Sequence, residues 1–186
     1  LKAVPEFNGL PAVLHKSRLL IAPSSDYVEN AFNPVKYGGF SNAPTLEIVL
    51  PTASTPHASQ TLSAVVGYMP HGPSGGWTEA LRNDATSQIM AVLDAYAPGI
   101  GALAQASELL TPADIQAETG AAGGHWHHGE MGIDQILNVR PINGMAHYHC
   151  GVDGLYLCGA SAHPGGDING APGRNSALQA LKDGAL

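Results

Sequence analysis

Positive charge is scarce in this sequence. Its 186 residues include eight Lys and Arg against fifteen Asp and Glu, which gives a formal net charge of −7 at pH 7. The few basic side chains are scattered along the chain, so they form no basic face that could follow a phosphate backbone. We therefore exclude nucleic acid as the partner.

Long apolar runs and cysteines are also few. The longest apolar stretches have the length of a strand, far short of a membrane span, and no charged segment followed by an apolar core opens the sequence. We expect a cytoplasmic protein with no integral membrane segment, which could touch a membrane only through a surface patch. Cys150 and Cys158 cannot build a disulfide framework, and we expect them to be structural thiols, with Cys158 buried in a strand.

Several catalytic signatures are missing. No GxSxG elbow is present, which excludes that kind of serine nucleophile, and no HExxH motif fixes a zinc geometry. The first thirty residues contain no GxGxxG turn. The one similar pattern, Gly99-Ile-Gly101, follows a segment with helical rather than strand periodicity, so we predict no dinucleotide turn there.

The chain does contain enough apolar residues, 44%, for one sizeable core. Apolar runs of strand length occupy residues 18–22, 46–50 and 62–69, and prolines bound the second run on both sides. Because such boundaries are typical of turns between strands, we predict that the second and third runs pair in antiparallel fashion.

Helical spacing is clearest after Trp77, where apolar residues recur on one face from Leu81 to Tyr96 before Pro98 and Gly99 end the pattern. Ser24 or Ser25 can cap a shorter helix. Thr111 can cap another, with Pro112 at its first position. The segment 120–151, rich in Gly and His, is expected to be an ordered loop.

The most informative stretch runs from Gly154 to Ala177. It predicts a short apolar strand, a glycine-rich turn from Gly159 and a helix that begins near Gly170. In that order, such elements let backbone N–H groups approach a ligand, while the positive end of the helix dipole favours negative charge. From spacing alone, an ordinary strand-turn-helix connection is an equal alternative.

This stretch, GLYLCG at 154–159, HPGGD at 163–167 and GAPGRN at 170–175, resembles the C-terminal signature of phytoene dehydrogenase-like FAD-dependent oxidoreductases. The usual form of that signature is a GLYLCG strand, a THPGGG-type turn and a GAPGRNAA helix start. Further motifs similar to the family are Thr111-Pro-Ala-Asp114, Gly123-Gly124 with His128-Gly129, Asp134-Gln135 and Arg140-Pro141. The resemblance covers nearly the whole chain.

The resemblance implies an α+β fold in two parts. Residues 1–119 would belong to a substrate-binding domain, with an antiparallel sheet and packed helices. Residues 120–186 would be the C-terminal part of an FAD-binding domain, with its closing strand and helix. The βαβ unit that holds the FAD pyrophosphate would lie in a missing N-terminal half. We therefore expect a C-terminal fragment that is inactive alone, lacks tightly bound FAD and forms a homo-oligomer through exposed apolar surface.

The resemblance also implies a site. The loop 159–167 would pass the ribityl chain and isoalloxazine of FAD, and the backbone at residues 170–173 would face the N1–C2=O edge of the flavin. Hydride would pass to the flavin from an apolar, polyene-like substrate. His128 is the candidate catalytic residue. The candidate cofactor-binding residues are Gly159, Ala160, Pro164, Gly165, Gly166, Asp167, Gly170, Ala171 and Pro172.

Two positions depart from the family pattern. Ala160 stands where many related flavoenzymes have an acidic residue that hydrogen-bonds the ribityl chain. Asp167 replaces the third glycine of the usual turn, and its carboxylate would oppose negative charge on the flavin unless it points to solvent. Either change predicts altered flavin binding.

Histidines provide a rival hypothesis, in which the chain is a non-enzymatic metal-binding or assembly module. Two pairs at i, i+2 spacing, His125 with His127 and His147 with His149, would each project from one face if extended. With His128, His163 and Glu130 they could bind Zn, Ni or Fe. Only His128 and His163 match the flavoenzyme pattern. We expect hydrogen-bonded loop histidines and no native metal site.

Overall fold

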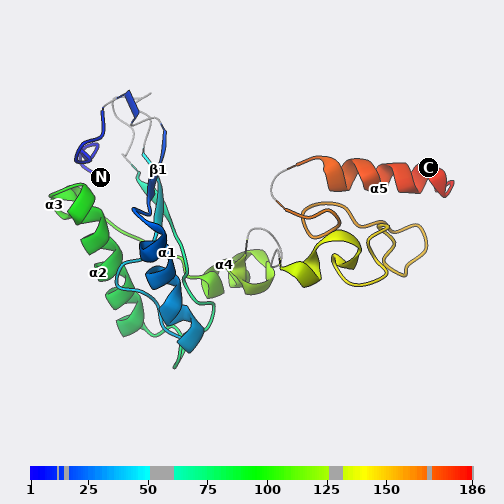
Figure 1. Ribbon diagram of the computed structural model, residues 1–186, viewed down its shortest axis with the longest axis horizontal. Coiled ribbons are helices and arrows are strands. Elements are labelled where there is room, and N and C mark those ends of the chain that lie inside the picture. The colour runs from blue at the N-terminus through cyan, green and yellow to red at the C-terminus, as the bar shows by residue number, and fades with distance from the viewer. Residues whose placement is uncertain (12, 15–16, 51–60, 126–131, 167–168, 186) are drawn as a thin grey trace. The chain divides into compact units, whose positions relative to one another are not determined.

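The computed structural model describes residues 1–11, 13–14, 17–50, 61–125, 132–166 and 169–185 (Figure 1). The chain divides into two compact units, Leu1–Thr111 and Pro112–Leu186. Strands lie in the first unit and helices in both, which confirms the α+β class.

A three-stranded antiparallel sheet forms the centre of the first unit, with the strand order β1-β2-β3. The strands are β1 (Arg18–Ile21), β2 (Leu46–Val49) and β3 (Ser63–Val66). Ile48 lies opposite Leu19 on one side and Ala64 on the other. The predicted antiparallel pairing of the second and third runs is confirmed.

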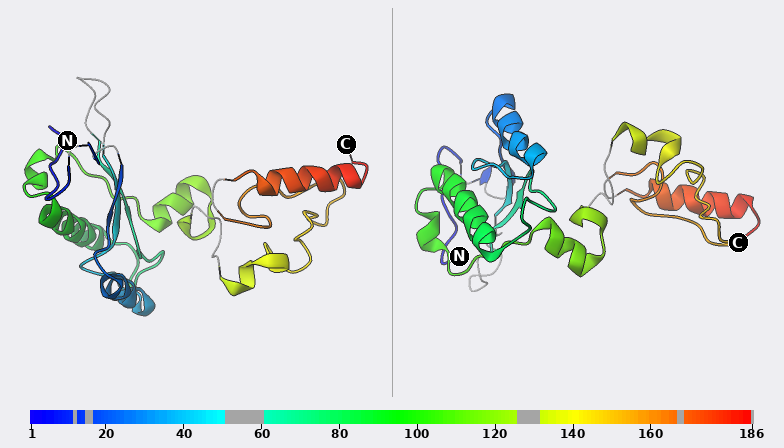
Figure 2. Two further views of the ribbon diagram at one scale, coloured as in Figure 1. Left: turned by 45° about the horizontal axis from the view of Figure 1, so that its top comes forward. Right: turned by 90° about the horizontal axis from the view of Figure 1, so that it is seen from below.

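Helix α2 (Glu79–Tyr96) packs along one face of the sheet (Figure 2). It begins where the Thr78 hydroxyl accepts a hydrogen bond of 3.2 Å from the Leu81 N–H. The short helix α3 (Ile100–Leu103) follows directly. Fully buried Leu46 and Ile48 of β2 form one core with Val92, Leu93, Ala97 and Ile100. The apolar stripe predicted after Trp77 is therefore the core face of α2.

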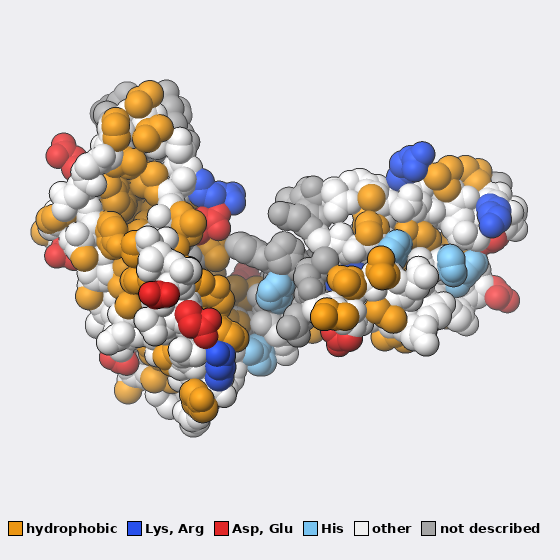
Figure 3. Space-filling view, in the orientation of Figure 1, with side chains coloured by type: hydrophobic (Ala, Val, Ile, Leu, Met, Phe, Trp, Pro, Cys, Tyr) orange, Lys and Arg blue, Asp and Glu red, His pale blue; other side chains and the backbone are white. Residues whose placement is uncertain are grey.

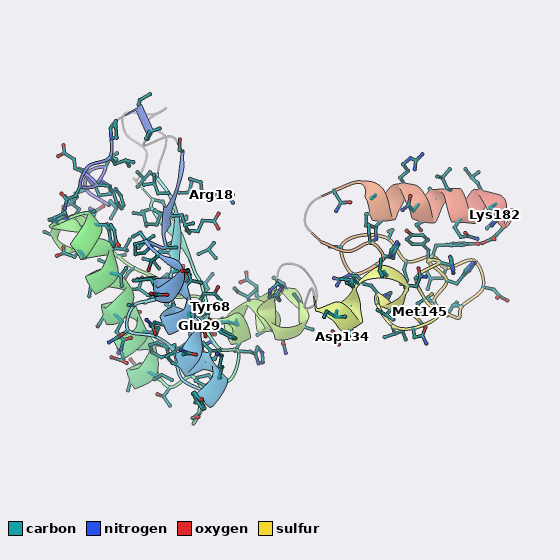
Figure 4. All side chains as sticks on the ribbon, viewed as in Figure 1. Arg18, Glu29, Tyr68, Asp134, Met145 and Lys182 are labelled. Carbon is teal, nitrogen blue, oxygen red and sulfur yellow. The ribbon has the colours of Figure 1, made fainter. Side chains whose placement is uncertain are left out.

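The opposite face of the same sheet is exposed and carries three aliphatic side chains among polar ones. Because side chains alternate along a strand, Leu20, Val49 and Val65 point away from α2, and they are 68%, 49% and 44% exposed. An Arg18–Glu47 ion pair of 2.5 Å crosses β1 and β2 beside them, and Figure 4 marks Arg18. Apolar side chains cover much of the visible surface of this unit (Figure 3).

Helix α1 (Ser25–Phe32) begins at Ser24, whose hydroxyl accepts from the Tyr27 N–H at 3.1 Å. The predicted serine cap is confirmed. A 3-10 helix, η2 (Asn33–Tyr37), continues the chain. The Phe32 ring contacts the Tyr68 ring, with 5.4 Å between centroids, and the Lys36 ammonium lies 4.8 Å from the Phe32 ring centroid.

The second unit begins with α4 (Pro112–Thr119), at the predicted start, and continues through turns of 3-10 helix. These are η3 (Ala122–Gly124), η4 (Ile133–Gln135) and η5 (Leu137–Val139). The Gly123 N–H donates to Gln116 Oε1 at 2.6 Å, and a β-carbon at Gly124 would overlap the Pro112 backbone. The glycine pair thus folds tightly over the start of α4.

The final helix is α5 (Ala171–Lys182), with Pro172 in its first turn as predicted. The strand expected from Gly154 to Cys158 is not found in this described segment, where Tyr156 makes one isolated bridge with His149. A strand needs a continuous ladder of backbone partners, and here pairing stops after a single residue. Cys158 is exposed, so its predicted burial is wrong; both cysteines are free thiols.

The unit boundary lies at residues 111 and 112, eight positions before the boundary predicted at 119 and 120. Helix α4 therefore groups with the C-terminal unit, because its contacts are mainly with η3. Assigning the units to substrate-binding and FAD-binding domains stays a prediction. None of the helices in the described ranges has the length and apolar character needed to cross a membrane.

Candidate functional site

The candidate site is the loop that follows Tyr156 and leads into α5. Its backbone enters the left-handed region at Gly159, Gly165 and Gly166, with φ of 92°, 78° and 90°. Residues with a β-carbon rarely adopt such angles, so the path of this loop favours glycine at all three positions. The glycines thus have a conformational reason that holds whether or not a ligand is bound.

Side-chain hydrogen bonds of three residues, Arg140, Tyr148 and His163, join the loop to earlier segments. Buried Arg140 donates to the Ala160 carbonyl from Nε at 3.3 Å and from Nη2 at 3.0 Å. The Tyr148 hydroxyl donates to the His163 carbonyl at 3.0 Å. His163 Nδ1 lies 2.7 Å from the Leu137 carbonyl, and since a carbonyl only accepts, Nδ1 carries the proton.

Gly165 is buried against Arg140. A β-carbon at this position would lie 2.5 Å from Arg140 Cδ and closer still to Nε. The absent side chain therefore makes room for the arginine. This contact explains the glycine at position 165 without a cofactor, and so it competes with the expectation that Gly165 lies against one.

The other glycines of the loop and helix start have free space beside them. Counting only the described residues, a β-carbon at Gly159, Gly166, Gly170 or Gly173 would meet no heavy atom within 4 Å. A bound molecule could therefore approach the backbone closely at these four positions. This is the space that a flavin ring or ribityl chain would need.

At the start of α5, fewer backbone N–H groups are available to a ligand than those expected at residues 170–173. The Ala171 N–H donates to Asn169 Oδ1 at 2.9 Å, and buried Pro172 has no N–H. First-turn N–H groups have no partner within their own helix, so Gly170 and Gly173 hold the donors that could face a ligand. Ala171 and Pro172 instead shape and bury the helix start.

Gly173 is informative because neither conformation nor packing explains it. It lies inside the first turn of α5, where its φ is not positive and its β-carbon position is open among the described residues. Glycine at a helical position costs about 0.5–1 kcal/mol relative to alanine. A close ligand is one physical reason to keep it.

Of the remaining predicted site residues, two are described by the structure and two are not. Ala160 contributes its carbonyl as the acceptor for Arg140, and Pro164 is exposed. The candidate catalytic His128 and the candidate Asp167 lie outside the described residues. No structural observation therefore tests either role.

The histidines of the rival hypothesis do not gather where the structure describes them. No group of three or more His, Cys, Asp or Glu in the described ranges could hold a metal ion. His127 and Glu130 lie outside these ranges. His163 Nδ1 is engaged by Leu137, and His149 lies 3.3 Å from Asp183 Oδ2, where it forms an ion pair when protonated.

Around His149 lies a small polar cluster at the end of α5. The Tyr156 hydroxyl donates to Asp183 Oδ2 at 2.9 Å, and the His149 and Tyr156 rings lie 5.2 Å apart. Loss of hydration raises the pKa of Tyr156, and so do the hydrogen bond and the charge of Asp183. Gln179 Nε2 donates to the second carboxylate oxygen. The cluster joins the segment around the isolated bridge to α5.

Sequence reasoning missed the two main anchors of the loop. Arg140 was noted only as part of an Arg-Pro pair, yet it is 1% exposed. Arginine is rarely buried to this degree, and no periodicity around it signals burial. Tyr148 is 6% exposed with φ of 73°, an angle unusual for a residue with a β-carbon and not marked by any local pattern.

The chain is similar to the pyridine nucleotide-disulfide oxidoreductase domain-containing protein 2 of Rattus norvegicus, with 36% identity over 162 residues. The Mus musculus protein of the same name is 35% identical over 162 residues. Each match covers 84% of this chain and 28% of the relative's length, so the chain spans under a third of these relatives. No protein-family model and no solved structure matches the chain.

Proposed function

We propose that this chain is the C-terminal part of an FAD-dependent oxidoreductase, here called the parent protein. Gly173 carries the proposal: a glycine in the first turn of a helix, beside open space, that neither conformation nor packing among the described residues requires. The similarity to oxidoreductase-domain proteins supports the same direction. The rest of the FAD-binding domain, including its pyrophosphate-binding half, would belong to the parent protein.

When bound, FAD would accept a hydride from an apolar substrate of the phytoene dehydrogenase-like type. The residues of this chain would bind and orient the FAD. The loop 159–166 would present its bare backbone to the flavin, and the N–H groups of Gly170 and Gly173 would stabilise negative charge at the flavin edge, aided by the dipole of α5. His128 is the residue that we propose to line the flavin or the substrate.

The alternative, a metal-binding or assembly module, finds less support. His149 and His163 both serve contacts within the fold, with Asp183 and Leu137. Each contact uses one ring nitrogen and leaves the other, so the observation that weighs against a metal site is that no three potential ligands gather among the described residues. Metal analysis of the parent protein beside its absorption spectrum separates the two functions.

The sharpest test is Gly173→Ala in the parent protein. Alanine has a higher helix propensity than glycine, so we expect the free energy of unfolding to stay equal or to rise by about 0.4–1 kcal/mol. If the backbone at Gly173 lies against the flavin, FAD affinity should fall at least about tenfold, equivalent to about 1.4 kcal/mol. FAD occupancy per folded molecule and thermal unfolding measure the two effects separately.

Gly101→Ala is the matched control, because Gly101 also lies in a helix with no described heavy atom within 4 Å of its β-carbon position. It should leave FAD affinity unchanged. Gly166→Val is a less clean test, because φ of 90° strains any larger residue there even without a cofactor. Undiminished FAD affinity in a folded Gly173→Ala protein would sink the proposed site.

A further inference from the structure

We propose that Arg140 is a positioning residue for this site: its buried guanidinium sets the shape of the loop 160–165 and thereby the place of Gly166 beside the flavin. The proposal deepens the proposed function and rests on it for the identity of the ligand. It rests on the contacts of Arg140 for the role of the residue.

The first contact is a fork onto one main-chain oxygen. Nε and Nη2 of Arg140 both donate to the Ala160 carbonyl, at 3.3 and 3.0 Å. Arg140 is 1% exposed, so these bonds lie in a site with little water. Hydrogen bonds from a charged donor are stronger than neutral ones, and their loss leaves a buried polar group unsatisfied.

The second contact is steric and comes from the other end of the loop. The missing side chain of Gly165 leaves space that Arg140 Nε, Cδ and Cζ fill. The arginine is therefore enclosed between the Ala160 carbonyl and the Gly165 backbone. Residues 160–165 fold around it, and its size sets the separation between the two ends of the loop.

Gly166 follows directly, and its β-carbon position is open among the described residues. Because Gly165 cannot move inward while Arg140 fills the space, the position of Gly166 depends on the arginine. Tyr148 fixes the middle of the same loop through the His163 carbonyl. Arg140 acts on the position of Gly166 through its contacts with Ala160 and Gly165.

Lysine cannot replace this residue. An ammonium is a point donor on a flexible stem, whereas the planar guanidinium presents Nε and Nη2 at a fixed spacing and fills more volume. Arg140→Lys keeps the charge and loses the fork, and Arg140→Met keeps an unbranched apolar side chain and loses every donor.

The experiment uses the parent protein with Arg140→Lys, Arg140→Met and Gly165→Ala. For each we measure FAD affinity, the visible circular dichroism of bound flavin and hydrogen exchange of the amides in residues 160–166. We expect exchange in this segment to rise at least about tenfold in Arg140→Met and FAD affinity to fall by a similar factor, which corresponds to about 1.4 kcal/mol. Arg140→Lys should lie between the parent and Arg140→Met. Gly165→Ala should also raise exchange and lower FAD affinity, because its β-carbon displaces the arginine and is strained at φ of 78°, so the Arg140 variants decide the role.

Lys182→Met is the control, since Lys182 is an exposed cation in the last turn of α5. It should change none of the three measurements. Parental exchange, FAD affinity and visible dichroism in Arg140→Met would overturn the positioning role. If Arg140→Met fails to fold, Arg140→Lys decides: exchange that rises only in 160–166 supports the role, and unchanged exchange refutes it.

The two proposals fail in different ways. If the parent protein holds no flavin, the proposed function is wrong, and hydrogen exchange alone still judges whether Arg140 shapes the loop. If FAD binds and Gly173→Ala weakens it while both Arg140 variants bind normally, the site stands and the role of Arg140 is wrong.

Discussion

At the scale of single residues, three glycines of the second unit differ in what lies beside them. Gly124 has no room for a side chain because the backbone of Pro112 lies against it. Gly165 gives its space to Arg140. Gly173 has neither constraint, and what distinguishes it from Gly101, which is equally unconstrained, is its place at the start of α5 after the glycine-rich loop. A glycine-rich sequence predicts none of these differences, because they depend on whether a residue distant in the chain lies beside the glycine.

The hydroxyl of Tyr156 gives a prediction in alkaline solution. Its folded-state pKa is raised above the ordinary value of 10.0, first by loss of hydration and then by Asp183. Because the protonated hydroxyl is the form that the fold favours, its contribution to stability is full below pH 10 and is lost as the pH rises through the folded-state pKa.

We therefore expect the unsubstituted chain to lose more stability than Tyr156→Phe as the pH rises from about 9 to about 11, a range that spans the ordinary tyrosine pKa of ~10. Urea unfolding at several pH values measures the difference. Tyr37→Phe is the comparison, because the Tyr37 side chain is 84% exposed. Identical pH dependence in the parental and Tyr156→Phe chains would contradict the prediction.

At the scale of elements, the sheet of the first unit has two faces with different roles. Ile48 is fully buried against α2, whereas its neighbour Val49 points the other way and is 49% exposed. Both are aliphatic residues in the same strand. The sequence alone could not tell which face of the sheet α2 covers, because both faces carry apolar residues.

This asymmetry predicts unequal costs for similar truncations. Ile48→Ala should lower the free energy of unfolding by about 2–5 kcal/mol, because it opens a cavity in a packed core. Val49→Ala should cost about 0.5 kcal/mol or less, as is usual for exposed sites. Urea denaturation of both variants gives the comparison, and equal costs would mean that the outer face is covered in solution.

The elements also show where sequence reasoning works. The strands β2 and β3, the helix after Trp77, the cap at Ser24 and the helix start at Pro112 were predictable because their signals are local. The segment from Gly154 to Cys158 was not, because a strand requires partners that local apolar character cannot supply. In the site, the glycine-rich turn from Gly159 followed from the sequence, but the enclosure of Arg140 did not.

At the scale of the whole molecule, the chain spans 28% of the relatives that it matches. Leu20, Val49 and Val65 are exposed aliphatic side chains on one sheet face of the first unit. The side chains of Leu178 and Leu181 on α5 are 49% and 57% exposed. Exposed apolar surface favours association. We propose that the rest of the parent protein, or a second copy, covers it.

The isolated chain should therefore form dimers or larger oligomers. It should also hold no tightly bound FAD, because the βαβ unit that binds the pyrophosphate would belong to the rest of the parent protein. Light scattering over a range of concentrations measures the first property, and the absorption spectrum after gel filtration measures the second. Leu20→Ser combined with Val65→Ser, on the exposed face, should shift the chain towards monomer. A parental chain that stays monomeric at high concentration, or that retains one flavin per chain, would contradict these expectations.

The anchor at residue 160 has a consequence for sequence change. Arg140 bonds the Ala160 carbonyl, and every amino acid has that oxygen. The loop is therefore held without regard to which side chain residue 160 carries. The acidic residue common here in related flavoenzymes could be exchanged for alanine without loss of the turn, so a ribityl contact could be gained or lost by one substitution while the surrounding backbone stays in place.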